Sequence, residues 1–381
     1  MRFVTRIMIP LALGSQFVQF AGAMGLPRES RPTFREWTDD NNVVLVIQLL
    51  PDTKNAEKYQ RDAVIIEIIR GKGILAEGAK TIPIDKPIPV VDPMQPRTLI
   101  IFGERLKGQW EWNFGMNADA DAIRCVKGLL KLDLKNNKQL LRFSFDFLAS
   151  ANHTLVERAV REWNNATAAD TGAVAKDLPA GQIRALVEDR KAPRYVRDLA
   201  CFLLGYCGEE KDVALIRSHM ERAEEGYGPA PRYDVDPLKG YVLLKPKEGF
   251  AFVAALMKDS KRGFADRYRA LLAARYIHDH HDNLIEKQDV ERLFADVLSD
   301  GDLADFVIND FRRWKRWNYT DRVLVHFGKA SHNVPVIKNA ILRYALRCPD
   351  PACIQFVAEQ RRNDRQWVLD NEEYLRFETA R

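Results

Sequence analysis

The densest group of side chains able to hold a charged ligand is a basic, aromatic run near the C-terminal end of the chain. Its members are Arg312, Arg313, Trp314, Lys315, Arg316 and Trp317. On a helix the two tryptophans would continue an apolar stripe begun by Val307 and Phe311, with the four cations around the opposite side. That surface could bind an acidic protein, an anionic glycan or a lipid headgroup. The alternative is structural, because the tryptophans could pack between helices while the cations pair with neighbouring acids and favour the helix C-terminus.

A second group, His278-Asp279-His280-His281-Asp282, has the residue types of a metal site. Zinc needs three or four converging ligands, yet only His278 and His281 would share a helix face, while His280 points elsewhere. No cysteine or second histidine cluster stands near this group in the sequence. We interpret the group as a solvated helix end and assign no metal.

The sequence patterns of well-known catalytic sites are missing. The chain has no H-E-x-x-H, no G-x-S-x-G, no P-loop and no G-x-G-x-x-G that opens a helix after a strand. No nucleophile stands beside a base at a recognisable spacing. We expect no cofactor and assign no catalytic residue. An enzyme whose site is assembled from distant residues stays open as an alternative.

The five cysteines are too few for a disulfide scaffold in a chain of 381 residues, and their odd number leaves at least one outside any intrachain pair. Cys348 and Cys353 flank Pro349-Asp350-Pro351-Ala352, where a helix must stop and turn. They could therefore reach the separation that a disulfide requires. Buried thiols are the alternative for these cysteines and the expectation for the others.

Residues 1–23 have the features of a secretory signal peptide. Arg2 and Arg6 give a positive start, the stretch from Ile7 to Phe20 is mostly apolar, and Ala21-Gly22-Ala23 supplies the small residues that signal peptidase accepts. Proline, glycine and glutamine interrupt the apolar stretch, whereas a membrane-spanning helix needs ~20 mostly apolar residues. We expect an exported protein, periplasmic or extracellular, with no stable membrane span after cleavage. A disordered N-terminus is the alternative.

The charge balance disfavours nucleic acid as a partner. The chain has 58 basic and 53 acidic residues, and loss of the two signal-peptide arginines would leave 56 against 53, a net charge of +3. Nucleic-acid binders usually carry a strong basic excess or a concentrated basic stripe.

The pattern after the signal peptide predicts a linker at residues 24–35 and a small β domain at 36–118. Short β-branched or aromatic runs alternate with glycine, proline and aspartate clusters, as is typical of a small barrel or sandwich. An OB-like barrel is our first choice. The expected strands are Val43 to Leu50, Ala63 to Ile69, Thr81 to Ile84, Thr98 to Phe102 and Trp110 to Phe114.

From Asp119 to residue 381 the apolar period changes to 3.6, which predicts a wholly helical domain. The fold class is therefore α+β, and an irregular stretch from Glu224 to Gly240 is expected within the helical part. The expected helices are Ala122 to Leu134, Lys138 to Ala149, Thr154 to Ala168, Ala180 to Glu188, Arg194 to Tyr206, Asp212 to Ala223, Phe250 to Met257, Arg267 to His278, Val290 to Leu298, Leu303 to Trp317, Asp321 to Phe327, Val336 to Leu346, Ala352 to Arg361 and Gln366 to Phe377.

An internal echo suggests that these helices form repeats. An Arg-Tyr pair followed closely by apolar residues occurs at Arg194-Tyr195, Arg267-Tyr268 and Arg343-Tyr344. The starts lie 73 and 76 residues apart, about twice the ~35 to 45 residues of a two-helix unit. The spacing predicts a stacked array of the HEAT-like α-solenoid type, which usually serves to bind other molecules.

Roughly residues 40 to 380 resemble uncharacterised exported planctomycete proteins that are described only as HEAT-like repeat proteins. The resemblance is carried by the segments at 203–208, 240–244, 310–317 and 340–349, read as LLGYCG, GYVLL, DFRRWKRW and AILRYALRCP. It implies an exported protein with a β-rich N-terminal domain and a helical array. It implies no activity, ligand or catalytic residue.

These features together predict a non-enzymatic exported scaffold that uses a helical-repeat surface for protein–protein interaction. An array leaves a long continuous face free for contacts, because each repeat touches only its neighbours. One alternative is an envelope enzyme or enzyme subunit with its site at the junction of the β and helical domains. Another is a glycan or anionic-surface binder that uses residues 312–317.

Overall fold

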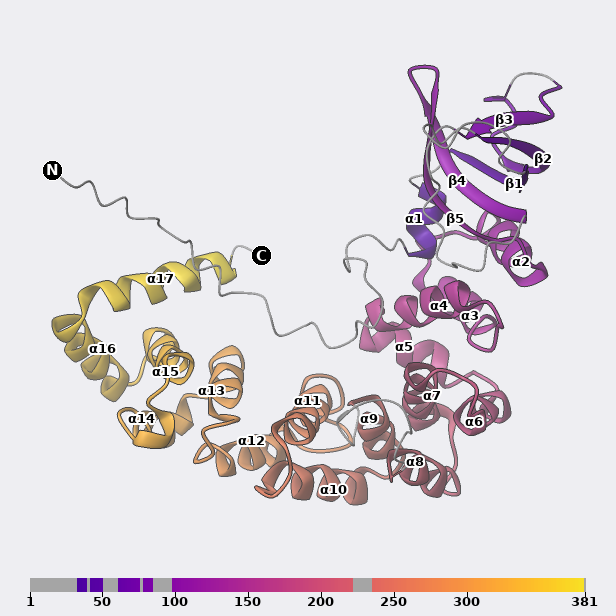
Figure 1. Cartoon of the computed structure of the whole chain (residues 1–381). Helices are drawn as coiled ribbons and strands as arrows, with labels where there is room; N and C mark the ends of the chain where they lie inside the picture. The colour runs from indigo at the N-terminus through magenta and orange to yellow at the C-terminus, as the bar shows by residue number, and fades with distance from the viewer. Residues whose placement is uncertain are drawn as a thin grey trace, which may run out of the picture. The chain divides into compact units, whose positions relative to one another are not determined.

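The computed structural model describes residues 33–39, 42–50, 61–75, 78–84, 98–221 and 235–379. The expected signal peptide at 1–23 and most of the expected 24–35 linker lie outside these ranges. The chain divides into two compact units, residues 1–118 and 119–381, called here the N-terminal unit and the helical unit. Figure 1 shows the strands gathered in the first and the succession of helices in the second, so the fold class is α+β.

The N-terminal unit holds a five-stranded sheet in the order β3-β2-β1-β4-β5, in which every neighbouring pair is antiparallel. Five strands were expected at these positions, and all five are confirmed. β4 and β5 are longer than expected because their hairpin continues to a tight turn with Lys107 and Gly108 at positive φ. The strands are β1 (Val43–Leu49), β2 (Arg61–Arg70), β3 (Thr81–Ile84), β4 (Thr98–Leu106) and β5 (Gln109–Asn117).

The central strand β1 is buried on both faces. Val43, Leu45 and Ile47 alternate along it and pack in one apolar cluster with residues of β2, β3 and β4. Val44 and Val46 point to the opposite face and are buried as well. Apolar residues at successive positions are typical of a strand that is buried on both faces. In β1 both faces of the strand are covered by other side chains.

The second layer is a short helix, α1 (Phe34–Asp39), which begins inside the linker expected at residues 24–35. The Trp37 ring stacks on Phe102 and Phe114 of the sheet, with centroids 5.3 Å and 5.5 Å apart. Thr33 and Glu36 cap the helix reciprocally, because the Glu36 amide donates to Thr33 Oγ1 and the Thr33 amide donates to the Glu36 carboxylate. The linker expectation was wrong at its last two residues, and no helix was expected from 36 to 39, since a capping box starts a helix that apolar contacts then stabilise.

The helical unit contains helices through almost all of its described length. Their bounds are α2 (Ala120–Leu129), α3 (Asn137–Phe145), α4 (His153–Asn165), α5 (Ala168–Ala175), α6 (Ala180–Glu188), α7 (Arg194–Cys207), α8 (Asp212–Glu221), α9 (Val235–Leu244), α10 (Pro246–Lys258), α11 (Phe264–His280), α12 (Lys287–Asp296), α13 (Ala304–Arg313), α14 (Thr320–Leu324), α15 (Pro335–Arg347), α16 (Pro351–Asn363) and α17 (Arg365–Thr379), with short 3-10 turns at Trp317–Tyr319 and Ala330–His332.

Two helices were missed in the sequence, α5 and α9. The first is a short, alanine-rich helix whose weak amphipathic signal is completed by tertiary packing. The second falls in the stretch predicted to be irregular up to Gly240, a prediction that was wrong for residues 235–240. Pro237 lies in the first turn of α9, where a missing amide proton costs little.

Gly240 is needed because α9 crosses α7 at very short range. A Cβ added at Gly240 would stand 2.1 Å from the backbone oxygen of Cys201, and one added at Gly205 would stand 2.9 Å from Gly240 itself. The two backbones therefore touch where both helices have glycine. The residue that weakened the sequence signal for a helix is the one that allows this helix to pack.

The turns between paired helices share one local structure. The side-chain oxygen of Asp133, Asp189, Asp259 and Asp300 accepts a hydrogen bond from the backbone amide two residues later, at 2.9 to 3.0 Å. In each turn the backbone oxygen of the same aspartate also accepts from the amide three residues later. An aspartate satisfies the free backbone groups between two helices in this way, so the same turn recurs at α2–α3, α6–α7, α10–α11 and α12–α13.

A buried arginine follows two of these turns at a constant distance. Arg197 and Arg267 each lie eight residues after the turn aspartate, and both are more than nine-tenths buried. Arg158 follows Ser150 by the same eight residues, and Ser150 Oγ accepts the Asn152 amide at 3.1 Å as the aspartates do. The spacing between these arginines is 39 and 70 residues.

The Arg-Tyr echo of the sequence does not mark equivalent positions. Arg194 is the first residue of α7, Arg267 the fourth of α11, and Arg343 the ninth of α15. Tyr195 is 41% exposed whereas Tyr344 is fully buried. The Arg-Tyr echo therefore gives no evidence of a structural repeat.

We predict that Gly240→Ala lowers the free energy of unfolding by about 1 to 3 kcal/mol, because its methyl group must force α9 away from the α7 backbone. Chemical denaturation followed by circular dichroism measures the change. Gly181→Ala is the matched control, since a Cβ there meets nothing within 4 Å in the described structure. In the control the free energy of unfolding should rise by about 0.5 to 1 kcal/mol. An equal change in stability in the two variants would contradict the close crossing of α7 and α9.

Candidate functional site

The basic, aromatic run does not continue its helix. α13 ends at Arg313, and Lys315 has φ +56°, in the left-handed region. The Lys315 amide donates to the Arg312 oxygen at 3.2 Å, and the Arg316 amide donates to the Phe311 oxygen at 2.8 Å. These two bonds define a Schellman motif in which lysine occupies the position usually taken by glycine. The expectation of one helix from Leu303 to Trp317 was wrong at its C-terminal end.

The three guanidinium groups of the run are paired inside the chain. Arg312 is buried and donates through two nitrogens to the Glu378 carboxylate of α17, at 2.8 Å to one oxygen. Arg313 lies 2.7 Å from Asp310, a buried acid of its own helix. Arg316 donates to Glu291 of α12. These contacts satisfy most of the charge of the run.

Lys315 differs from the three arginines. Its side chain is exposed at the tip of the turn, and the described residues give it no hydrogen-bond or ion-pair partner. Lys315 is therefore the cation of the run that is most open to a ligand in solution.

The tryptophans lie in two different contacts. The Trp314 ring stacks on the His278 imidazole with centroids 3.5 Å apart, and its Nε1 donates to Asp279 Oδ1 at 2.8 Å. Trp317 meets the Tyr344 ring edge-on at 5.1 Å. Both indole side chains are half-buried, so the stripe begun by the fully buried Val307 and Phe311 does not continue as one helical face.

His278 belongs to the same polar network as the run. Its Nδ1 lies 3.0 Å from Asp279 Oδ1, and its Nε2 lies 3.3 Å from Glu291 Oε1. Burial raises the pKa of Asp279, but the hydrogen bonds from His278 and Trp314 outweigh it and hold that pKa below its usual range. The network connects α11, α12 and the end of α13 through hydrogen bonds that range from buried to exposed, so it joins these three elements at one place.

The three histidines of the 278–282 group diverge. His278 is buried in the network above, His280 is exposed beside the Tyr276 ring, and His281 turns to a different set of side chains. Within the ranges that the structure describes, no three histidine, cysteine, aspartate or glutamate side chains converge well enough to hold a metal ion.

A cluster that the sequence did not reveal joins two phenols and an imidazole. Tyr206 Oη lies 2.7 Å from Tyr276 Oη and 3.2 Å from His281 Nε2, and the Tyr276 hydroxyl lies 3.4 Å from the same nitrogen. Lys239 of α9 stands over the Tyr276 ring at 4.7 Å. The phenols are 70 residues apart in the chain, so no short motif could identify the cluster.

The chemistry of this cluster is that of neutral hydrogen-bonding groups. Burial lowers the pKa of His281 and raises the pKa of Tyr206 and of Tyr276. All three side chains are therefore uncharged near neutral pH, and each already has partners within the cluster. They connect α7 with the end of α11.

A buried histidine–carboxylate pair lies between α7 and α8. His219 Nε2 is 2.6 Å from Asp198 Oδ1, and the two side chains are 3% and 6% exposed. In hydrolases such a pair orients an imidazole toward a nucleophile. Here the burial of both groups keeps a substrate in solution away from them, so the pair is better explained as a contact between the two helices.

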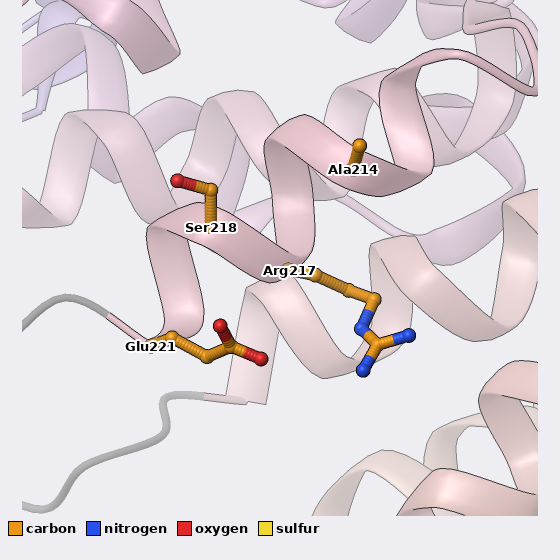
Figure 2. Close-up of a pocket in the computed structure, with 4 residues that line it drawn as sticks. All are labelled: Ala214, Arg217, Ser218 and Glu221. Carbon is orange, nitrogen blue, oxygen red and sulfur yellow. The ribbon is translucent and has the colours of Figure 1, made fainter.

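A hollow of about 480 Å³ lies along α8 and is lined by Ala214, Arg217, Ser218 and Glu221. Figure 2 shows these four side chains on the helix. All four residues come from one helix. The Arg217 guanidinium lies 3.8 Å from Glu248 Oε1, an oxygen that also accepts from the Tyr241 hydroxyl at 2.6 Å. A hollow lined by a single helix gives no reason to assign a catalytic residue.

No protein-family model, curated protein or solved structure matches this chain. Among the described residues, none of the helices has the length and apolar character needed to cross a bilayer.

His326 and His332 form a second histidine pair, close to α14. Their rings stack with centroids 4.3 Å apart, and both side chains are buried. His332 is held by Ser331 Oγ and by the Leu298 oxygen, each at 2.8 Å. His326 Nδ1 has no hydrogen-bond partner in the described structure. Burial, and then the charge of neighbouring cations, lowers the pKa of His326 to about 4.

We predict that Lys315→Gly raises the free energy of unfolding by about 1 kcal/mol, because glycine adopts the left-handed conformation without strain. Lys338→Gly in α15 is the matched control and should lower it by about 0.5 to 1 kcal/mol, since glycine weakens a helix interior. Urea denaturation of both variants provides the comparison. A loss of stability in Lys315→Gly would disprove the Schellman motif at this position.

His326 should make the protein less stable in mild acid. Its folded pKa lies below the ordinary value near 6.5, so the unfolded chain takes up a proton first as the pH falls. The contribution of the neutral His326 side chain to the free energy of unfolding is complete above pH 6.5, and it is lost as the pH falls toward 4. Asp305 acts in the opposite direction, because burial raises its pKa to about 6 and the folded chain then takes up its proton first.

The measurement is therefore the difference in free energy of unfolding between the wild type and His326→Gln at each pH. Asp305 is present in both proteins, so its contribution cancels in this difference. Between pH 7 and pH 5 the wild type should lose about 1 to 2 kcal/mol relative to the variant. Parallel curves for the two proteins would show that His326 can be protonated in the folded state.

Proposed function

We propose that this chain is a non-enzymatic exported scaffold whose helical unit binds a protein partner. The observation that carries the proposal is the order of packing in the helical unit. Helices with extensive contacts are separated by at most two intervening helices, as α4 and α7 are. Figure 1 shows the helices from α2 to α17 succeeding one another in the order of the chain. Such packing buries a continuous core and leaves long faces of the stack open to other molecules.

We further propose that the helical unit is a HEAT-like α-solenoid. The recurring turn at Asp189 and Asp259, with a buried arginine eight residues later, supports a two-helix repeat. The step of 39 residues from Arg158 to Arg197 is one such unit, and the next step of 70 residues is about two.

For the N-terminal unit we propose an OB-like, partly open barrel. The order β3-β2-β1-β4-β5 is that of a five-stranded Greek-key barrel opened between β3 and β5. The apolar cluster on one face of β1, β2, β3 and β4 is consistent with the interior of such a barrel.

Exposed apolar side chains point to the C-terminal helices as the contact surface. Of the twelve large apolar residues that are exposed in the described structure, seven lie between residues 325 and 377. Ile354 of α16 is 61% exposed and Phe377 of α17 is 66% exposed. Apolar side chains that gather on a surface commonly mark a protein contact, whereas scattered ones need no explanation.

The ion pairs of the basic run favour a protein partner over an anionic glycan or lipid. Arg312, Arg313 and Arg316 already have carboxylate partners, so an anion would have to compete with Glu378, Asp310 and Glu291 for them.

The proposed export of the protein rests on the signal peptide expected at residues 1–23.

We predict that a protein partner captured from envelope extract by the wild type is lost by the double variant Ile354→Ser with Phe377→Ser. Both side chains are exposed, so the variant should keep the helical circular dichroism of the wild type. Affinity capture followed by mass spectrometry identifies the partner, and titration of the purified partner should show at least a tenfold weaker affinity, about 1.4 kcal/mol.

Ile66→Ser is the matched control, because Ile66 is an exposed apolar residue of β2 in the other unit. It should bind the partner as the wild type does. Sedimentation of the purified chain identifies the case in which the partner is a second copy. If the folded wild type and the folded Ile66→Ser control capture no protein and both sediment as monomers, the proposed scaffold function is wrong.

A further inference from the structure

Two cysteines meet where α15 turns into α16. Cys348 is the residue that ends α15, and Cys353 lies in the first turn of α16. Pro351 begins α16, and the Asp350 side chain accepts the Ala352 amide at 2.8 Å as the helix cap. The intervening turn thus holds the two ends in a fixed relation.

The two thiols share one buried site. Cys348 is 5% exposed and Cys353 is fully buried. Both are free thiols in this structure, and Thr320 Oγ1 lies 3.4 Å from Cys348 Sγ and 3.9 Å from Cys353 Sγ. One hydroxyl group therefore lies beside both sulfur atoms, so the two thiols belong to one site at the turn between α15 and α16.

We infer that Cys348 and Cys353 are a redox modification site that forms an intrachain disulfide between the end of α15 and the start of α16. The oxidant is another disulfide, either a small molecule such as oxidised glutathione or an oxidoreductase. The thiolate of one cysteine attacks it, forms a mixed disulfide and expels one thiolate. The second cysteine, after losing its proton, attacks the mixed disulfide and expels the other thiolate. Two thiols are oxidised and one disulfide is reduced to two thiols.

The order of events follows from burial. Desolvation, and then the neighbouring Cys348 thiol, raises the pKa of the Cys353 thiol to about 12, so its reactive thiolate is scarce in the folded protein. A bulky disulfide also has no access to a fully buried sulfur. The bond therefore forms while α16 is still undocked, and it stays protected once the helix has packed.

The location gives the bond a structural purpose. Within α16 only Cys353 and Gln360 are buried, so this helix contributes little to the core. α16 contacts α15 and α17, and α17 supplies the Glu378 partner of Arg312. A covalent link at the start of α16 would hold the last two helices in place where apolar burial is small.

The test uses the full chain, refolded from the reduced and denatured state in a mixture of reduced and oxidised glutathione. Alkylation under denaturing conditions and peptide mass spectrometry then report the state of each cysteine. We expect residues 348 and 353 in one internally bridged peptide and alkylation of the other three cysteines. Reduction should lower the melting temperature by about 2 to 4 °C. Alkylation of both Cys348 and Cys353, or a disulfide-linked dimer, would overturn the inference.

Two comparisons keep the result independent of folding failure. The folded, reduced chain in the same buffer should form the bond at least a hundredfold more slowly than the refolding chain. Cys207→Ser should keep the bridged peptide and the melting shift, whereas Cys348→Ser should lose both and leave Cys353 open to alkylation after denaturation. A melting shift that persists in Cys348→Ser would assign it to another pair.

Discussion

The packing of the helical unit depends on buried arginines, whose guanidinium groups must find acceptors away from water. Arg267 shows how this constraint is met. Its Nε donates to the Met257 oxygen at 3.1 Å near the end of α10, and a terminal nitrogen donates to Asp300 in the turn between α12 and α13. One side chain of α11 therefore fixes the helix before it and the turn after it. Because an unpaired guanidinium would be very unfavourable at this depth, these positions cannot shift independently.

The same constraint governs the basic run. Arg313 pairs with an acid of its own helix α13, Arg316 with an acid of the preceding helix α12, and Arg312 with an acid of the distant helix α17. Much of the charge that suggested a binding surface is therefore used inside the helical unit. The exposed Lys315 is a consequence of the turn that redirects the chain after α13. The proposed protein contact therefore rests on exposed apolar side chains of the last helices and not on the charges of this run.

The N-terminal unit is organised by a different requirement, the burial of both faces of β1. Alternate residues of this strand enter the cluster with β2, β3 and β4, and the others lie on the opposite face of the sheet. On that face Trp37 packs against Phe102 and Phe114. A helix of six residues would be marginal alone, and the aromatic contacts with the sheet stabilise it.

The sequence by itself determined the fold class, the positions of the strands and most helices, and the absence of a recognisable catalytic motif. These follow from apolar periodicity and from turn residues, which act over a few neighbours in the chain. Tertiary structure alone decided that residues 235–244 are helical, since the glycine that argues against a helix is required by the Cys201 backbone. It also decided that the run breaks at Lys315, and that Tyr206, Tyr276 and His281 meet. Contacts between residues 30 to 75 positions apart have no local signature, because helix packing and not chain spacing brings them together.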